Sequence, residues 1–592
     1  MAEIWLWNSI PTRKRAPSDG FLENGLSILK GYVEERGHKA RVIDWQKSSF
    51  YGSLCFRWLL AINRLSTILI FRLARKGRSF AKAYFPVFNL IQEAVSYVNK
   101  KSMSKHLEKL ADEAVNAGVK IFGIKVWYGE AFEWADWLTK RLKEKDPSIL
   151  VIAGGFHTTL YEDDLLRESS FDLGVVSEGE RALEIILDIA DKHINNWDKD
   201  RALEDVRKEI NENRLKNVVY RDGKDIKLTD RYSQELHNKT FPKYNKEDIE
   251  GKLRVHILID SVGCPWGRCN FCTHWHIHPN FTPRPIDDIV SEIEYMLKKG
   301  VGVFRFAGSE TPPGFGARIA KAILNKDLKI KYAIGCRAIK GITSDEERYE
   351  MVVSEFEVML QSGLCGIFMG GESGNDIIND KMMNKGINCA EIIETARAYR
   401  EAQEKTGISA FFGLALIYPH PLVDGITFEQ AFNDDLNLIK ALNPDSVIVT
   451  PSSPFKNSVW YREKEKFHFD IPDDYIKRMI RYEYVLYKPP SLWPSLGDVS
   501  AQGVGFKQAL LMCEGLRKAI EKIGIQTDLT DDCFLLMQAA GYLGKEGMAR
   551  FKRETSVDLV SADYRNIDQI AEQLNEYSKT LAESNYSLND GF

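Results

Sequence analysis

The sequence lacks the features that would place the protein in a membrane, a secretion route or a nucleic-acid complex. No run of eighteen apolar residues is free of charge, and the N-terminus has no basic segment followed by an apolar one, as a signal peptide would. The net charge is −4, whereas general nucleic-acid binders are normally basic. Six of the nine cysteines stand alone, so no disulfide framework is indicated. We therefore expect a cytoplasmic monomer without nucleic-acid or membrane partners.

One segment departs from this ordinary composition. Residues 56–73 are rich in apolar side chains but are interrupted by Arg57, Arg64 and Arg72, and further basic residues follow up to Lys82. We interpret residues 46–112 as a helical insertion that packs on its own domain. Contact with a membrane surface or a lipid-like substrate is the alternative.

The three remaining cysteines lie close together. Cys264, Cys269 and Cys272 fall within nine positions, directly after an apolar, β-branched run at 255–259 that predicts a strand. Glycine and proline residues among them force a loop. Three thiolates so close together indicate a metal site. A structural zinc ion usually takes four protein ligands, whereas an iron–sulfur cluster held by three thiolates leaves one iron open.

The first third of the chain alternates strands and helices. Strands are expected at 3–8, up to 44, 120–127, 149–155 and 171–177, so residues 1–190 predict a doubly wound, Rossmann-like α/β domain. Ligands of such folds bind at the carboxyl ends of the strands. The segments G-G-F-H-T-T (154–159) and S-E-G-E (177–180) stand at two of these ends, where paired glycines let a backbone approach a flat ligand.

The rest of the chain divides into three parts. Residues 191–250 are rich in charge, contain a hairpin across Asp222-Gly223, and form a connector. Residues 251–466 repeat a strand–helix unit six times, which predicts a partial barrel of parallel strands with its chemistry at their carboxyl ends. Residues 467–592 predict an α-helical C-terminal domain that covers the barrel mouth. The six barrel strands are expected at 255–260, 302–307, 330–335, 365–370, 409–416 and 446–450.

The cysteine loop resembles the cluster loop of the radical S-adenosylmethionine (SAM) superfamily, with an aromatic residue, Phe271, just before the last cysteine. The usual spacing in that superfamily is C-x3-C-x2-C, whereas this chain reads C-x4-C-x2-C, with the extra residue in P-W-G-R. The resemblance implies a [4Fe–4S] cluster on Cys264, Cys269 and Cys272, with SAM bound at the open iron.

Polar groups after the next three strands fit the same resemblance. A-G-S-E-T (307–311) resembles the family's G-G-E segment, and G-G-E-S-G (370–374) resembles its G-x-E-S-G segment. Glu310 would accept from the SAM amine, and Arg337 would pair with its carboxylate through two donors. Singly, Glu310 is equally explained as a solvated acid and Arg337 as half of a structural ion pair. The implied SAM contacts are Phe271, Gly308, Ser309, Glu310, Arg337, Glu372 and Ser373.

The first domain resembles the cobalamin-binding domain that precedes many radical SAM domains. The match lies in P-S-D-G (17–20), G-G-F-H-T-T and S-E-G-E, in that order. No D-x-H-x-x-G motif occurs, so the resemblance implies cobalamin with its own base displaced and no histidine replacing it. His157 is either a contact or an ordinary loop residue. The implied cobalamin contacts are Ser18, Asp19, Gly154, Gly155, His157, Ser177, Glu178, Gly179 and Glu180.

Three histidines alternate just after the cysteines. His274, His276 and His278 would share one face if the segment were extended. His274 or His276 is a candidate for the base that moves a proton near the substrate, and one of the three could instead complete a zinc site or simply pack in the loop. Tyr418, Tyr487 and Trp493 are candidates for lining a substrate cavity, with Tyr418 also a candidate catalytic residue, although aromatic side chains are commonly core residues.

These resemblances imply a cobalamin-dependent radical SAM methyltransferase. A 5′-deoxyadenosyl radical would abstract hydrogen from an unactivated carbon of a small-molecule or peptide substrate, and that carbon would then take a methyl group from methylcobalamin. An electron donor such as flavodoxin or ferredoxin is implied as a partner. The alternative enzyme keeps the cofactors and forms or rearranges a ring without methyl transfer. The alternative from another class is a zinc-stabilised ligand-binding protein.

Overall fold

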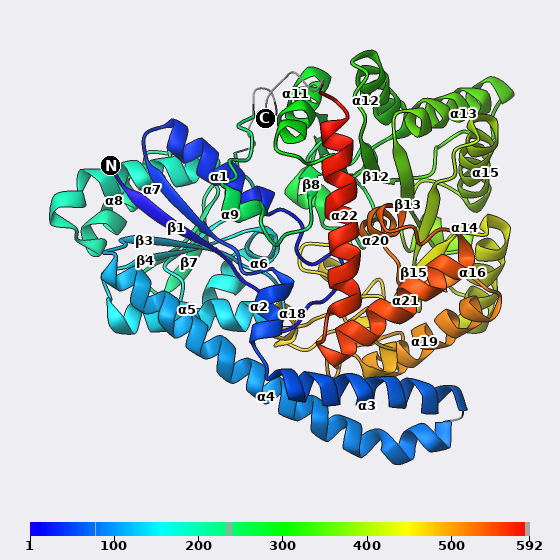
Figure 1. Cartoon of the computed structure of the whole chain (residues 1–592), viewed down its shortest axis with the longest axis horizontal. Coiled ribbons are helices and arrows are strands. Elements are labelled where there is room, and N and C mark those ends of the chain that lie inside the picture. The colour runs from blue at the N-terminus through cyan, green and yellow to red at the C-terminus, as the bar shows by residue number, and fades with distance from the viewer. Residues whose placement is uncertain (77, 233–235, 237–238, 587–592) are drawn as a thin grey trace.

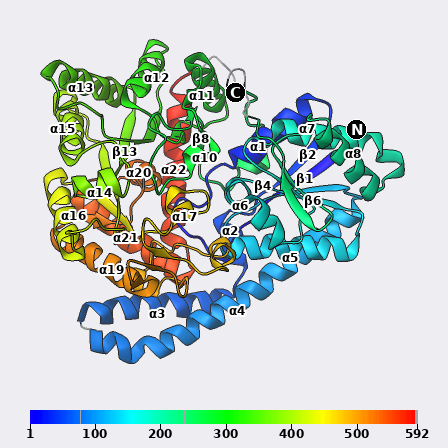
Figure 2. The same cartoon turned by 180° about the vertical axis from the view of Figure 1, so that it is seen from behind.

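Two seven-stranded sheets, one in each half of the chain, organise the structure (Figure 1). The computed structural model describes residues 1–76, 78–232, 236 and 239–586. In both views the first sheet and its helices lie beside the second sheet, and the C-terminal helices pack on the second half (Figure 2).

The first sheet has five parallel strands and an antiparallel hairpin at its edge. Its order is β2-β1-β3-β4-β5-β6-β7, and the hairpin β6–β7 turns at the expected Asp222-Gly223 and pairs with β5, so it extends this sheet. The strands are β1 (Glu3–Asn8), β2 (Lys39–Ile43), β3 (Ile121–Lys125), β4 (Leu150–Gly154), β5 (Leu173–Val175), β6 (Val218–Asp222) and β7 (Asp225–Leu228).

Alternating apolar side chains bury both faces of this sheet. In β1, Ile4 and Leu6 pack with helices α1 and α7, whereas Trp5 and Trp7 pack with α4 and α5 on the other side. A parallel sheet covered on both faces is the physical reason why these strands are apolar throughout. The covering helices are α1 (Asn24–Glu35), α4 (Arg78–Asn116), α5 (Glu130–Lys145), α6 (Phe156–Arg167), α7 (Glu180–Lys192) and α8 (Lys199–Asn211).

The insertion between β2 and β3 is helical. It contains α2 (Ser48–Ser53), α3 (Arg57–Lys76) and α4, and the second half of α4 buries Met103, Leu107 and Leu110 beside the first sheet. The first half of α4 forms a hairpin with α3 that runs under α19 and α21 along the lower edge of the molecule in both views (Figures 1 and 2).

The second sheet is the expected partial barrel. Its order is β8-β11-β12-β13-β14-β15-β19, all parallel, and among the described strands none joins β8 to β19. The six predicted strands are confirmed, and the seventh, β19, comes from the C-terminal part of the chain. The strands are β8 (Val255–Leu258), β11 (Val303–Phe306), β12 (Lys331–Cys336), β13 (Leu364–Glu372), β14 (Phe411–Ile417), β15 (Ser446–Thr450) and β19 (Gln526–Thr527).

Helices on the outside and short elements at the ends complete the barrel half. The outer helices are α11 (Ile286–Lys298), α12 (Pro313–Asn325), α13 (Glu346–Gln361), α15 (Cys389–Thr406) and α16 (Phe428–Leu442). The short elements are α9 (Lys246–Ile249), β9 (Ser261–Val262), α10 (His274–Ile277), β10 (Thr282–Pro283), α14 (Asp376–Lys381), α17 (Val459–Arg462), β16 (Phe469–Asp470), α18 (Tyr475–Ile480), β17 (Ser500–Ala501) and β18 (Val504–Gly505).

The C-terminal helices close the end of the barrel at which the strands begin. Phe534 of α20 is buried and stacks on Phe411, the first residue of β14, at a ring distance of 5.0 Å. It shares a core cluster with Val255 and Val303, the first residues of β8 and β11. The expected cover over the barrel mouth is therefore wrong for these helices, because their apolar faces pack on the opposite end. The helices are α19 (Phe506–Lys522), α20 (Asp531–Ala539), α21 (Gly544–Ser561) and α22 (Arg565–Glu583).

Replacing Phe534 tests this closure. Gly366 and Gly413 leave room for its ring, since a Cβ at either would lie 3.0 Å or less from Phe534. We expect Phe534→Ala to lower the free energy of unfolding by about 3–5 kcal/mol, the usual cost of emptying an aromatic site in a core. Denaturant unfolding followed by fluorescence measures this change, with the exposed Leu543→Ala on the loop between α20 and α21 as the control. Equal stability of the two variants would contradict the closure by α20.

Candidate functional site

The cysteine loop leaves the carboxyl end of β8 and turns through two left-handed glycines. Gly263 has a φ of 75° and Gly267 a φ of 55°, so the glycine next to the extra residue of the loop adopts a conformation that other residues rarely take. A Cβ on Gly263 would lie 2.1 Å from the Asn280 carbonyl oxygen, which restricts this position to glycine. The Trp266 indole donates to the Asn384 carbonyl at 2.7 Å and ties the loop to the chain after α14.

The three loop cysteines are free and half-buried. Cys264 Sγ donates to Glu310 Oε2 at 3.0 Å. Burial raises the pKa of all three thiols, to about 12 for Cys269, against the opposing charge of Lys385. Free thiols on one loop, facing a buried cation, have the chemistry of the donor set that a [4Fe–4S] cluster needs.

No three histidine, cysteine or acidic side chains are placed to hold one single metal ion anywhere in the described ranges 1–76, 78–232, 236 and 239–586. A four-iron cluster gives each thiolate its own iron and so spreads its ligands more widely. Phe271, expected beside the cluster, lies half-buried with its ring 5.8 Å from the Trp460 ring of α17. The Trp460 amide donates to the Asn270 carbonyl, so α17 flanks the loop.

A buried ion pair lies next to the cysteines. Lys385 Nζ is 2.7 Å from Glu372 Oε1, and both side chains are buried. Burial is the largest effect and acts to lower the pKa of Lys385, but the charge and hydrogen bond of Glu372 together with the effect of Cys269 raise this pKa. Glu372 ends β13 at a bulge with a φ of 59°, a strained conformation for a residue with a side chain. A Cβ on Gly370 would lie 2.3 Å from Glu372 Oε1, so glycine there makes room for the pair.

The segment after β11 is held by a buried aspartate. Asp260 accepts from the Gly308 amide and from the Thr311 hydroxyl, both at 2.9 Å, and burial raises its pKa to about 6. This places Glu310 against Cys264, and burial raises the pKa of Glu310. Ser309 lies on the same turn, with its hydroxyl 3.0 Å from His274 Nδ1.

Arg337 follows β12 and carries a buried donor with no partner among the described residues. Its guanidinium lies 5.2 Å from the Trp266 ring centroid, and one Nη donates to the Lys385 carbonyl. Its Nε has no hydrogen-bond acceptor in the part of the chain that the structure describes. An unpartnered guanidinium donor beside Glu310 and the cysteines fits the carboxylate of an amino-acid ligand, so these residues fit SAM.

Two predicted site residues are in the core and do not face this site. Ser373 is fully buried, with its hydroxyl 3.2 Å from both His420 Nε2 and Asp435 Oδ1, which is inconsistent with the expected contact of its side chain with SAM. The Tyr418 hydroxyl donates to the Phe428 carbonyl at 3.1 Å, and its ring packs on Phe432. The expectation of a catalytic Tyr418 is therefore wrong, because its polar atom is already used in the interior.

The buried Asp435 gives a pH test of the loop that carries Glu372. Burial raises the pKa of Asp435 to about 8, and its carboxyl accepts from the Gly374 amide and Ser373. The stability that this protonated acid contributes is fully present below its usual pKa and is lost as the pH rises through 8.

We expect Asp435→Asn, which keeps the acceptor oxygen, to remove this loss. Between pH 5.5 and 8.5 the native protein should lose about 1 kcal/mol per pH unit relative to the variant. Thermal unfolding across that range measures the difference, with the exposed Asp380→Asn on α14 as the control. Parallel pH profiles of Asp435→Asn and the native protein would refute the assignment.

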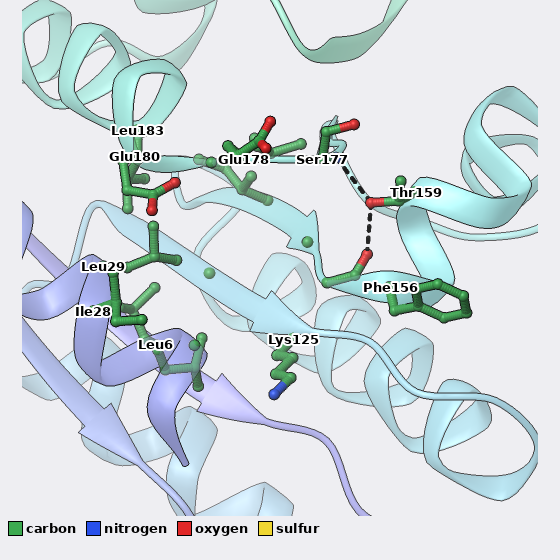
Figure 3. A pocket seen from close by; sticks show the side chains of 18 of the residues that line it. Leu6, Ile28, Leu29, Lys125, Phe156, Thr159, Ser177, Glu178, Glu180 and Leu183 are labelled. Carbon is green, nitrogen blue, oxygen red and sulfur yellow. Dashed lines mark hydrogen bonds between the residues drawn. The ribbon is translucent and has the colours of Figure 1, made fainter. Parts of the chain in front are cut away.

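A cavity of 370 Å³ lies at the carboxyl ends of the first sheet's strands (Figure 3). Its deep part is apolar, with Leu6, Leu29 and Leu183 from β1, α1 and α7, and barrel residues close its other side. Of the predicted cobalamin contacts, those that line it are Gly154, Gly155, Ser177, Glu178, Gly179 and Glu180.

The cavity walls are built by glycine and by one strained residue. A Cβ on Gly154 would meet only the Val175 carbonyl, at 3.9 Å, so glycine leaves open space in front of the strand. Ser177 has a φ of 57°, and its amide donates to Thr159 Oγ1, whose hydroxyl donates to the Gly155 carbonyl (Figure 3). An apolar slot that opens onto exposed backbone at strand ends fits a large flat ring with a tail, so these residues fit cobalamin.

The helix α10 lies between the cavity and the cysteine loop. His278, just after this helix, lines the cavity 4.0 Å from Glu178, and burial lowers the pKa of His278 to about 4. The His274 ring is 6.1 Å from Phe156, which also lines the cavity. Desolvation by the surrounding protein lowers the pKa of His274.

The expected extended segment of alternating histidines is wrong, because residues 274–277 form a helical turn. A helical turn separates His276 from His274 and His278 and places the latter two on one side. His276 is half-buried, and burial followed by the charge of Arg231 lowers its pKa. It lines neither the 370 Å³ cavity nor a second cavity of 280 Å³.

Three further predicted cobalamin contacts lie outside the cavity. His157 is buried, with Nε2 2.9 Å from the Ile480 carbonyl oxygen and its ring 4.8 Å from Tyr161, so it is a packing residue. Ser18 and Asp19 line a second cavity, of 280 Å³, and the Ser18 hydroxyl lies 3.3 Å from Asp532 Oδ2. The expectation for these three residues is not met, because their segments face the C-terminal half of the chain.

The second cavity holds one of the expected substrate-cavity residues. Tyr487 lines it, together with aromatic and charged side chains of the loops after β1 and β3 and of α20 and α21. Trp493 is buried elsewhere, and its indole donates to the Lys488 carbonyl at 2.9 Å. Lys385, Asp260 and Asp435 were not anticipated from the sequence, and none of them belongs to a recognisable motif.

Comparisons with known proteins also distinguish the first domain from the barrel. The model of the radical SAM superfamily matches residues 258–417, and the model of the B12-binding domain matches residues 91–187. The chain is 23% identical over 491 residues to an anaerobic magnesium-protoporphyrin IX monomethyl ester cyclase of Cereibacter sphaeroides, covering 78% of this chain and 72% of the relative. It is 26% identical over 259 residues to the enzyme of that name in Rubrivivax gelatinosus, covering 41% and 42%.

Two solved structures share the whole arrangement. The radical SAM methyltransferase TsrM of Kitasatospora setae, with cobalamin and a [4Fe–4S] cluster bound, aligns with a TM-score of 0.57 at 12% identity, covering 95% of this chain and 99% of that one. The cobalamin-dependent SAM radical enzyme OxsB, with aqua-cobalamin and SAM bound, aligns with a TM-score of 0.60 at 14% identity, covering 99% and 80%. At these identities the likeness concerns the fold.

Proposed function

This chain is a radical SAM protein with a B12-binding domain, and we propose that it methylates an unactivated carbon of a small-molecule or peptide substrate. It belongs to the cobalamin-dependent radical SAM enzymes, whose cofactors are a [4Fe–4S] cluster, SAM and cobalamin. The observation that supports the proposal most is the position of α10. This helix directly follows the cysteine loop, and the histidines at its two ends reach Ser309 on one side and the 370 Å³ cavity on the other.

The site residues around the cysteine loop would bind the cluster and SAM. When bound, the cofactors supply a hydrogen-abstracting radical from SAM on the cluster and a methyl group from cobalamin. Cys264, Cys269 and Cys272 would hold the cluster. Glu310 would accept from the SAM amine, and Arg337 would donate to its carboxylate from the unpartnered Nε.

The remaining assignments concern cobalamin and the proton. Gly154 and Gly155 would let the ring approach the strand ends, and the apolar slot beyond them would take its tail. His274 is the proposed base, because its Nδ1 lies 3.0 Å from Ser309 Oγ, which leaves Nε2 for a proton. A flavodoxin or ferredoxin would supply electrons.

A second candidate function keeps the same cofactors but forms or rearranges a ring. The observation that favours it is the name of the two relatives above, both of which are cyclases. The match to the radical SAM family model favours iron over zinc for the three cysteines, so we do not propose a zinc-stabilised ligand-binding protein.

Iron content tests the assignment of the cluster ligands. We expect anaerobically purified protein to be brown, and Cys264→Ala, Cys269→Ala and Cys272→Ala each to lose most of the bound iron and the visible absorption, because three thiolates hold one cluster. Cys389→Ala, which removes a half-buried cysteine at the start of α15, is the matched control and should keep both. Iron analysis and absorption spectra measure the change. Full iron content in a loop variant would contradict its role as a ligand.

The product separates methyl transfer from ring chemistry. Reconstituted protein is given a reductant, SAM with a deuterated methyl group, and a small-molecule extract as the source of substrate. We expect 5′-deoxyadenosine together with a new compound that carries the deuterated methyl group, detected by mass spectrometry. An unlabelled product that has lost hydrogen would favour the ring-forming alternative. No 5′-deoxyadenosine with any reductant would refute both.

A further inference from the structure

The hairpin of α3 and α4 exposes an unusual number of large apolar side chains. Of the twenty-two large hydrophobic side chains that are exposed among the described residues, ten lie within residues 56–97. A soluble protein rarely leaves so many together on one element unless that surface meets a partner or a lipid. The ten are Phe56, Trp58, Ile62, Leu65, Leu69, Phe80, Phe85, Val87, Leu90 and Tyr97.

The exposed apolar side chains on α3 follow the helical repeat. On α3 the exposed residues Trp58, Ile62, Leu65 and Leu69 succeed one another at intervals of four, three and four, which places them in one stripe. The exposed fraction of these side chains runs from 41% for Leu69 to 69% for Leu65, so the stripe is accessible to a partner. On α3 the exposed apolar side chains therefore form one continuous face.

The opposite side of α3 is firmly attached to the protein. The Asn63 amide donates to the Ser561 carbonyl at 2.7 Å and accepts from Gln92 of α4, and Arg64 pairs with the buried Asp558. The interpretation of a helical insertion packed on its own domain thus describes the inner side only. The outer stripe is held rigidly in place, so binding through it requires no ordering of the helices.

The charge of the hairpin identifies the kind of surface it fits. Residues 56–105 contain ten lysines and arginines and one acidic residue, Glu93, whereas the whole chain has a net charge of −4. Arg57, Arg72 and Lys82 are exposed and make no ion pair with another described residue. The side chains of Arg75, Lys76 and Arg78 lie outside the described part of the chain.

We propose that the α3–α4 hairpin docks the protein on an anionic lipid surface. The apolar stripe enters the boundary between head groups and acyl chains, and the basic residues pair with lipid phosphates, as in amphipathic helices that lie in the membrane plane. None of the described helices is long and apolar enough to cross a bilayer, so the contact is peripheral. This reverses the sequence-based expectation of no membrane partner.

Charge argues against a second copy of the chain on this face. A symmetric dimer would bring two hairpins, each with ten basic residues and one acid, against each other, and their repulsion opposes such pairing. An anionic bilayer removes this conflict, because it supplies the opposite charge and an apolar layer at once.

Vesicle binding of the full chain tests the proposal. The purified protein is centrifuged with sucrose-loaded vesicles of phosphatidylcholine, alone or mixed with phosphatidylglycerol. We expect at least about tenfold stronger binding to the mixed vesicles at low salt, falling as salt is added. The double variant Leu65→Ser/Leu90→Ser should bind at least about tenfold more weakly. Arg57→Glu/Arg72→Glu should lose only the preference for the anionic lipid.

The matched controls substitute exposed residues outside the hairpin. Leu511→Ser/Leu543→Ser removes two leucines that are 55% and 56% exposed, and Lys224→Glu/Lys298→Glu reverses two exposed charges. Both should bind like the native protein. The proposal is overturned by absence of binding to mixed vesicles, or by controls that lose as much as the hairpin variants. It is also overturned if Leu65→Ser/Leu90→Ser converts an oligomer to a monomer in sedimentation, which would assign the face to self-association.

Discussion

The ion pair of Lys385 and Glu372 is the interaction on which the cysteine site depends. Two opposite charges buried at 2.7 Å stabilise each other, but removing either one leaves an uncompensated charge in the interior. The pair is possible only because Gly370 leaves room for it and because Glu372 accepts a left-handed backbone at the end of β13. The strain at Glu372 is held in turn by the buried hydrogen bonds of the next residue, Ser373, with Asp435.

This arrangement sets the electrostatics for a negatively charged centre. Lys385 and Arg337 both act to lower the pKa of the Cys269 thiol, whereas burial, the largest effect, raises it to about 12. Without further positive charge the thiol keeps its proton. Iron would add that charge. The buried cations therefore favour thiolates at this site, but they do not deprotonate the thiols without iron. Such a balance protects the cysteines from reaction while no cluster is bound.

How much of this could be predicted from the sequence depends on the range of the interactions. The strands follow from local apolar patterns. The cysteine loop, G-G-F-H-T-T and S-E-G-E stand at strand ends, so the strands of both sheets and part of the cavity wall were predictable. Lys385 was not, because it belongs to no motif and meets Glu372 only after the chain passes α14. His157 and Tyr418 failed for a related reason: their polar atoms are used by Ile480 and Phe428, contacts that no local pattern reveals.

The distribution of charge along the chain connects the hairpin with the rest of the molecule. Since the chain as a whole is acidic while residues 56–105 are strongly basic, the remaining surface carries an excess of acid. An anionic bilayer therefore attracts one edge of the molecule and repels the other faces, which fixes the orientation as well as the contact. The hairpin forms the lower edge in both views, whereas the end of the first sheet with the N-terminus lies at the upper side (Figures 1 and 2). An apolar face that would otherwise favour aggregation is in this way restricted to a single partner, because the surrounding basic residues repel other copies of the chain.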